Sequence, residues 1–181
     1  MESLPPHLQQ IIDRCLQNDR KAQQQLYEMY AGKMLAICLR YCGDYQTAQD
    51  LMHDGFIKVF TNIGQFKNTG SFDGWMRKVM VNCSLNYYRQ SQFVVDSYEE
   101  TISMVDDTLQ PDQLQQLGAK EIIEMIGRLP SLQRIVFNLF AIEGYSHAEI
   151  ADKLQIKETT IRSNYLRARH TLQKMIEQNN K

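Results

Sequence analysis

A chain of 181 residues suffices for one medium domain or two small ones and excludes a large catalytic barrel. Hydrophobic residues make up 43% and charged residues 23%, which is typical of a soluble chain with a buried core. The net charge is −1, but residues 92–115 carry only acidic charges and the segments on both sides of them have a small basic excess. This distribution suggests two units that face a polyanion, joined by a polar connector.

No apolar run approaches the roughly 18 residues that a membrane span needs, and the first residues lack the pattern of a signal peptide. The four cysteines stand at positions 15, 38, 42 and 83, and three of them fall on apolar faces of predicted helices. A single C-x3-C spacing is a poor zinc site, so we expect reduced, buried thiols and a cytoplasmic protein.

Helical periodicity predicts four helices in residues 1–91. Asp19 is expected to cap the second helix, and Gly43-Asp44 to separate it from the third. Residues 64–70 are expected to form a loop, and the fourth helix to run from Ser71 to about Gln90. The apolar positions that we expect to face inward are Leu8, Ile11, Ile12, Cys15, Leu16, Leu26, Tyr30, Met34, Ile37, Tyr41, Ala48, Leu51, Met52, Phe56, Val59, Phe60, Ile63, Phe72, Trp75, Met76, Val79, Met80, Cys83 and Tyr87.

Residues 92–115 differ from their surroundings in being acidic and poor in apolar side chains. They are predicted to be a flexible linker with an r.m.s. span of about 27 Å and an extended reach of about 80 Å. Two turns of B-DNA measure about 70 Å, so two modules on this linker can touch one duplex at distant sites. The fold class is therefore all-α, with two small helical domains at 1–91 and 116–181.

The C-terminal segment predicts a helix-turn-helix. One helix is expected to end at Pro130-Ser131, which caps the next, and Gly144 is expected to end that one. Ser146 and Glu149 then have the spacing of a capping box at the start of a short helix. After a turn at 155–157, the last helix is expected to begin near Glu158 and to bury Ile161, Tyr165, Ala168 and Leu172.

The opposite face of this last helix carries hydroxyl and cationic side chains. Short hydroxyls permit close approach to a duplex, and arginine can reach guanine edges or phosphates. We therefore expect duplex DNA to be bound by Thr159, Thr160, Arg162, Ser163, Arg167, Arg169 and Lys174.

Several blocks of the sequence are similar to one known family. The stretch from Glu143 to Ala151 (EGYSHAEIA), with Leu129-Pro130 before it and RSNYLRAR at 162–169 after it, resembles the C-terminal domain of bacterial sigma factors. DLMHDGFIKVF at 50–60 and SFDGWMRKV at 71–79, with Asn82 after it, resemble the second region of the same family. Two such domains joined only by a linker are typical of the extracytoplasmic-function (ECF) subgroup.

The resemblance implies that the protein binds core RNA polymerase and promoter DNA, is held inactive by an anti-sigma factor, and directs transcription initiation without a catalytic residue, a metal, a cofactor or a small-molecule substrate. The C-terminal helix-turn-helix would recognise the −35 duplex. It further implies polymerase contacts by Asp50, His53, Asp54 and Lys58. The −10 element would be melted and bound by Phe66, Lys67, Asn68, Ser71, Phe72, Arg77 and Asn82.

The sequence departs from the family pattern at a few positions. Gln155 stands where the turn usually holds glycine, and Lys157 stands where a serine cap is common. His53 and Asp54 replace the usual glutamine and glutamate. Two other functions remain open at this point: a free-standing helix-turn-helix regulator that uses residues 1–91 for dimerisation or ligand sensing, and an adapter that binds only proteins.

Overall fold

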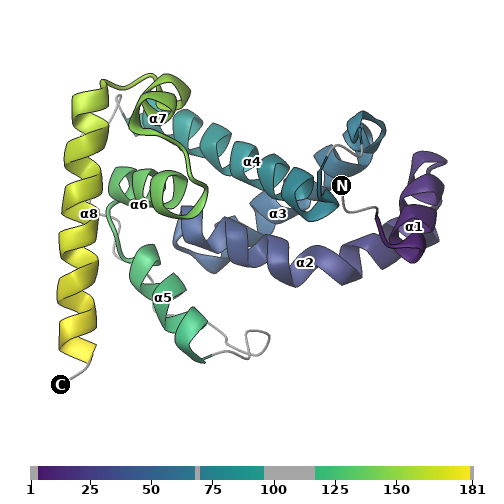
Figure 1. Ribbon diagram of the computed structural model, residues 1–181, viewed down its shortest axis with the longest axis horizontal. Coiled ribbons are helices and arrows are strands. Elements are labelled where there is room, and N and C mark those ends of the chain that lie inside the picture. The colour runs from purple at the N-terminus through teal and green to yellow at the C-terminus, as the bar shows by residue number, and fades with distance from the viewer. Residues whose placement is uncertain (1–3, 68–69, 96–116, 180–181) are drawn as a thin grey trace. The chain divides into compact units, whose positions relative to one another are not determined.

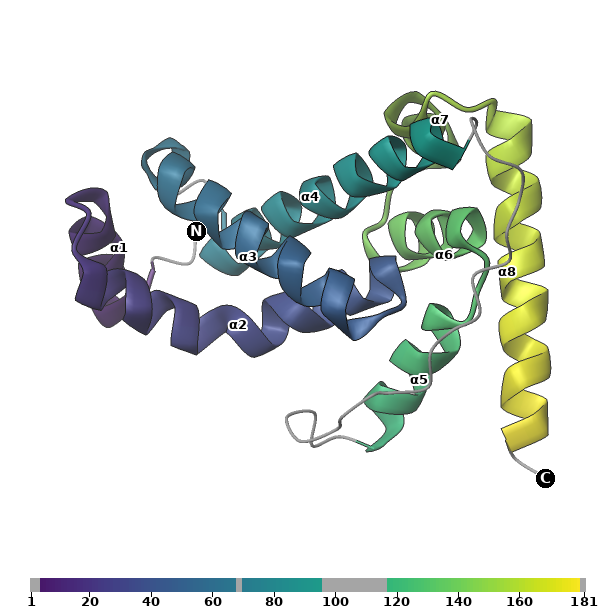
Figure 2. The same cartoon turned by 180° about the vertical axis from the view of Figure 1, so that it is seen from behind.

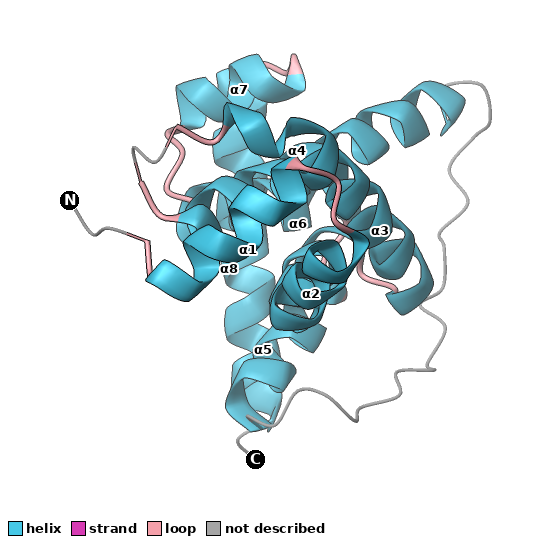
Figure 3. Cartoon of the chain, turned by 90° about the vertical axis from the view of Figure 1, so that its right-hand side faces the viewer, coloured by secondary structure: helices cyan, strands magenta, loops and turns pink. Residues whose placement is uncertain are grey.

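The computed structural model describes residues 4–67, 70–95 and 117–179. In these ranges the chain consists of helices and turns without a strand (Figure 3), which confirms the predicted all-α class. The contacts divide the chain into two compact units, Met1–Cys38 with Gln46–Ser84 and Leu39–Tyr45 with Leu85–Lys181. None of the helices in the described ranges is long and apolar enough to cross a membrane.

Four helices and one 3₁₀ turn make up the N-terminal part of the chain. They are α1 (Pro6–Leu16), α2 (Arg20–Cys42), α3 (Tyr45–Asn62), η1 (Ile63–Gln65) and α4 (Phe72–Val95). Asp19 caps α2 as predicted, because its Oδ1 accepts hydrogen bonds from the backbone N–H groups of Lys21 at 2.8 Å and Ala22 at 3.3 Å. Gly43, with φ of 85°, separates α2 from α3.

The predicted inward positions of residues 1–91 are buried or half-buried, with two corrections. Leu16 was expected to face inward but is 49% exposed. Tyr87 was expected to continue the inward face of α4 but is 43% exposed, whereas Met76 and Met80 are buried. Tyr87 follows Trp75 by twelve residues, which places the two side chains about 120° apart around the helix axis. Tyr87 therefore lies off the inward-facing stripe of α4.

A close approach between α3 and α4 depends on a glycine. Gly55 is buried on α3, and a Cβ atom built on it would overlap the sulfur of Met80 on α4. The absence of a side chain at Gly55 therefore lets the face of α4 that holds Met80 pack directly on the backbone of α3.

The second unit is built around the longest of its helices. Its elements beyond the described part of α4 are α5 (Leu117–Gly127), α6 (Ser131–Phe137), the π-helical segment η2 (Asn138–Ile142), α7 (His147–Leu154) and α8 (Glu158–Asn179). α5 and α6 lie along one side of α8, and α7 lies beside its first turns (Figures 1 and 2).

Two boundaries differ from the sequence-based expectation. α4 continues to Val95, so helix replaces the first residues of the predicted linker, and the remainder of that linker at 96–115 lies outside the described residues. Ser131 was expected to cap α6, but Pro130 occupies the cap position and no side chain bonds there. Proline has no side-chain acceptor for the free N–H groups of the first turn, so α6 begins without a polar cap.

The helix-turn-helix formed by α7 and α8 matches the prediction. Glu149 N–H donates to the Ser146 hydroxyl at 3.3 Å and Ser146 N–H donates to the Glu149 carboxylate at 2.8 Å, which completes the capping box. These bonds from Ser146 lower the pKa of Glu149.

Two residues with positive φ flank α7. Gly144, with φ of 79°, ends the preceding segment, and the turn places Gln155 in the left-handed region at φ 57°.

The left-handed Gln155 makes the turn a site where stability can be gained. Gln155→Gly removes a backbone strain of about 1 kcal/mol, so we expect slower amide hydrogen exchange in peptides from α7 and α8. Both variants lose the hydrogen bond from the Gln155 side chain to the Asp152 carbonyl, but Gln155→Ala keeps the backbone strain, so exchange there should accelerate. Peptides from α1 to α3 are the internal control, and faster exchange in Gln155→Gly than in the wild type would contradict the prediction.

Candidate nucleic-acid interface

The face that α8 turns outward is fixed by the residues that it buries. Ile161 and Ala168 are fully buried, and Asn164 is 8% exposed with its Nδ2 donating to the Thr160 carbonyl at 2.9 Å. Successive residues of a helix are about 100° apart, so Thr159, Ser163, Leu166 and His170 lie on the side of α8 opposite this buried stripe. The predicted outward face is therefore the outward face of the folded helix.

Four aromatic rings hold α8 against the rest of the helix-turn-helix. The ring of His147, at the start of α7, stacks on Phe140 with centroids 4.2 Å apart. Tyr165 of α8 meets Phe140 at 4.5 Å and Phe137 of α6 at 6.2 Å. His147 and Tyr165 meet edge to face at 5.7 Å. Because these rings join α8 to three other helical segments, α6, η2 and α7, α8 cannot rotate about its axis without disrupting them.

The predicted −35 residues differ in how they are presented. Thr159, Arg162, Arg167 and Lys174 are exposed on α8, whereas Thr160 and Ser163 are half-buried. The Ser163 hydroxyl donates to the Thr160 carbonyl at 3.0 Å. Arg162 is paired within the helix, because its Nε and Nη2 donate to Oε1 of Glu158 at 3.0 and 2.6 Å.

Sequence reasoning missed one residue of this surface. Leu166 is 62% exposed although it is apolar, and it lies on the outer face between Arg162 and His170. An exposed leucine among hydroxyl and cationic side chains can contact the methyl group of thymine in the major groove. Its position one residue past Tyr165, off the buried stripe, was the available signal.

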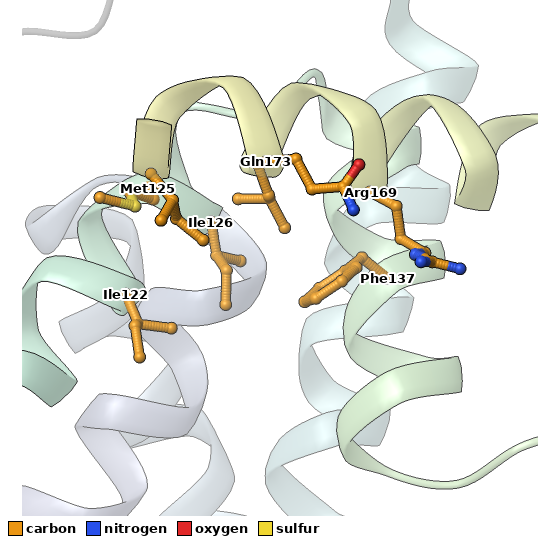
Figure 4. Close-up of a pocket in the computed structure, with 8 residues that line it drawn as sticks. Ile122, Met125, Ile126, Phe137, Arg169 and Gln173 are labelled. Atoms are coloured by element: carbon orange, nitrogen blue, oxygen red, sulfur yellow. The ribbon is translucent and has the colours of Figure 1, made fainter. Parts of the chain in front are cut away.

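Arg169 lies apart from the other predicted −35 residues. It stands beside an apolar groove of about 260 Å³ between α5, α6 and α8, in which Figure 4 shows it next to Phe137. Two of the apolar side chains at the groove, Ile122 and Ile176, are 57% and 47% exposed. Arg169 thus lines this groove and stands at the edge of the outward face of α8 rather than at its centre. The groove is lined by Ile122, Met125, Ile126, Phe137, Arg169, Leu172, Gln173 and Ile176.

The predicted −10 residues gather around the start of α4, where aromatic rings cluster. Phe72 is 1% exposed and packs against Phe66 at 5.1 Å and Trp75 at 5.5 Å between ring centroids. Burial closes the faces of Phe72 to a nucleic-acid base, so this ring supports the loop from within. Phe66 and Trp75 are each half-buried and meet at 5.8 Å.

The polar members of the −10 set are more accessible. Lys67 and Asn82 are exposed, Arg77 is half-buried, and Asn68 lies outside the described residues. Ser71 is exposed and caps α4, because its Oγ accepts a hydrogen bond from the backbone N–H of Gly74 at 3.0 Å.

The predicted polymerase contacts share one face of α3. Asp50, His53, Asp54 and Lys58 are all exposed, at the spacing of one helical stripe. Ile57 lies among them and is 63% exposed, which sequence reasoning missed although this residue is off the apolar stripe. The Tyr27 hydroxyl lies 3.2 Å from Nε2 of His53, which links this face to α2.

No cluster of three or more metal-ligating side chains occurs in the ranges that the structure describes. All four cysteines are free, and three are buried. Burial raises the pKa of Cys15 and of Cys83, which keeps both thiols protonated and unreactive.

Two family models match this chain, one on each side of the linker. Residues 26–94 match the model described as Sigma-70 region 2, and residues 119–172 match the model described as Sigma-70, region 4. The first covers the α3 face and the aromatic cluster of α4, and the second covers the helix-turn-helix.

Curated proteins match over most of their lengths. The RNA polymerase sigma-H factor of Pseudomonas aeruginosa is 27% identical over 180 residues, with 93% of each chain covered. The ECF RNA polymerase sigma-E factor of Haemophilus influenzae is 24% identical over 180 residues, with 93% of this chain and 95% of the relative covered. Among solved structures, the sigma factor RpoE of Bartonella quintana, determined in complex with the anti-sigma factor NepR, has the same fold with a TM-score of 0.55, 19% identity, and coverage of 85% and 96%.

Proposed function

The chain belongs to the extracytoplasmic-function sigma factors of the sigma-70 family, and from this we propose how its surfaces divide the work of initiation. It is a sigma factor, which binds core RNA polymerase and directs promoter-specific transcription. Sigma factors are DNA-binding initiation factors. We assign polymerase docking and the −10 element to a domain at 1–91, and the −35 element to a domain at 116–181.

The −35 assignment rests on the outward face of α8. Thr159 and Arg162 stand in its first two turns, where a recognition helix meets base edges, and Lys174 stands near its end, where such a helix meets phosphates. Leu166 adds an apolar contact suited to thymine. This face therefore combines polar, apolar and cationic side chains, which favours recognition of a base sequence in duplex DNA over attraction to phosphates alone.

The −10 assignment rests on the accessible amide of Asn82 and on the loop before α4. An unpaired base leaves the duplex at a cost of a few kcal/mol, which contacts to its edge and face must offset. Asn82 offers an exposed amide, Lys67 an exposed cation, and Phe66 a partly exposed ring. Phe72 supports this ring from below, and we assign it no contact with DNA.

Polymerase docking is assigned to α3. Exposed carboxylates at Asp50 and Asp54 flank the exposed Ile57, which gives an apolar centre with a charged rim. Such a composition is typical of protein interfaces. An anti-sigma factor is the further partner that we propose, because the solved sigma factor of the same fold was determined with one.

The function is tested by transcription with purified core polymerase. We expect the full-length protein to support run-off transcription from its own promoters and to co-purify with core polymerase. A free-standing regulator would bind DNA without core polymerase, and an adapter would support no transcription. The matches on both sides of the linker favour the sigma factor over either alternative.

Asn82→Ala tests the contact to the unpaired base. The loss of one hydrogen-bonding amide should weaken open-complex formation on a duplex promoter by about 1–3 kcal/mol, while binding to core polymerase stays unchanged. A promoter melted in advance should not rescue the variant, because the missing contact is to the base itself. Gln10→Ala, which removes an exposed amide from α1, is the matched control. Full activity of Asn82→Ala on duplex templates would refute the assignment.

Arg162→Ala and Lys174→Ala separate base readout from phosphate contact. Arg162→Ala should cost about 1–3 kcal/mol on the preferred −35 sequence and relax the preference at one or two base positions. Lys174→Ala should weaken binding evenly across sequences and lower the salt slope by about one unit. The measurement is holoenzyme binding to a −35 library at two salt concentrations. If Arg162→Ala has the sequence profile of the wild type, Arg162 does not read bases.

A further inference from the structure

Arg162 and Glu158 form an ion pair on the open side of α8. Both contacts go to one carboxylate oxygen, with Nε at 3.0 Å and Nη2 at 2.6 Å from Oε1. The side chains are 65% exposed for Arg162 and 40% exposed for Glu158, so the pair is not packed into the body of the domain. An exposed pair at this spacing contributes little to stability, which makes it a weak support for the fold.

The geometry leaves the reading edge of the guanidinium open. A guanidinium has five N–H donors. Glu158 accepts one hydrogen bond from Nε and one from Nη2, which together form one edge of the Arg162 guanidinium. The remaining donors, at Nη1 and on the outer side of Nη2, form a second edge that can donate hydrogen bonds to O6 and N7 of guanine. A carboxylate on one edge and a guanine on the other therefore fit the same arginine at once.

The pair also directs Arg162 toward the end of α8 that a recognition helix inserts most deeply. Glu158 is the first residue of α8, so its carboxylate draws the guanidinium toward the N-terminus of the helix. The first turn of a recognition helix is where base edges are contacted. A free arginine side chain loses rotamer entropy when it is fixed on DNA, and a guanidinium that is already held by Glu158 loses less of it.

A carboxylate at this place is otherwise unfavourable for binding DNA. From residue 157 to residue 174 the chain carries five lysines and arginines, and Glu158 is the one acidic residue in that stretch. A negative charge close to phosphates opposes association with any sequence. Its charge suits the N-terminal end of the helix dipole, as that of any acidic residue there does, but its contact with Arg162 is one that the dipole does not require.

We propose that Glu158 is a positioning residue that holds Arg162 so that its free edge selects guanine in the −35 duplex. This rests on the proposed assignment of α8 to that duplex. The contact makes Arg162 discriminate between bases instead of moving to the nearest phosphate.

The test measures sequence preference in the complete holoenzyme. Core polymerase is combined with the wild type, Glu158→Gln, Glu158→Asp, Arg162→Ala or the double variant Glu158→Gln/Arg162→Ala, and binding to a duplex library randomised in the −35 element is sequenced. We expect the preference for guanine at the Arg162 position to fall about 3- to 10-fold in Glu158→Gln, while binding to non-preferred sequences stays equal or rises.

The other variants separate positioning from helix stability. Glu158→Asp keeps the negative charge at the start of α8 but is one methylene shorter, so it should lose the guanine preference as Glu158→Gln does. In the Arg162→Ala background, Glu158→Gln should change nothing further at that base position. Glu177→Gln removes an acidic charge from the other end of α8 and should leave the profile unchanged.

Three outcomes overturn the proposal. Either the profile of Glu158→Gln equals that of the wild type, or its binding falls evenly over all sequences, or Glu158→Asp keeps the full preference. If Arg162→Ala alters the profile in the same experiment, the −35 assignment stands and only the role of Glu158 fails. If Arg162→Ala also leaves the profile unchanged, the assignment of Arg162 to base readout fails as well.

Discussion

The recognition surface depends on the packing that prevents α8 from turning about its axis. Ile161 and Ala168 are fully buried, and Tyr165 is enclosed by the rings of Phe137, Phe140 and His147. The capping box fixes where α7 begins, and the left-handed Gln155 fixes how the chain turns from α7 into α8. With its rotation set by these contacts, the helix presents one defined set of side chains to a partner.

The two proposed DNA surfaces suit different forms of nucleic acid. α8 presents a rigid face with short hydroxyls, an exposed leucine and a pre-positioned arginine, which suits the fixed edges of a duplex. The start of α4 presents a partly exposed ring, an amide and a cation beside a loop, which suits an unpaired base. A sigma factor must recognise both forms at one promoter, and we propose that these two surfaces divide that task.

Much of this architecture follows from sequence periodicity. The helix starts at Asp19, Ser146 and Glu158 and the stop at Gly144 were predictable because caps and glycines act locally. Exposure was harder to predict, because it depends on which neighbours a helix meets. Phe72 looks equally suited to a core and to a base, and its burial among Tyr30, Phe66 and Trp75 favours the core. The pairing of Arg162 with Glu158 was also missed, because a charged face read from sequence does not show which charges already hold each other.

The central claim, that α8 lies on duplex and α4 on unpaired DNA, is tested most directly by photo-crosslinking in the holoenzyme–promoter open complex. A photo-crosslinking amino acid replaces Thr159 on α8 in one protein and Lys78 on α4 in another, both of which are exposed. We expect the crosslink from position 159 to map to the −35 duplex and the crosslink from position 78 to map to the non-template strand of the −10 element. Crosslinks from both positions to one element, or from position 159 to polymerase alone, would contradict the account.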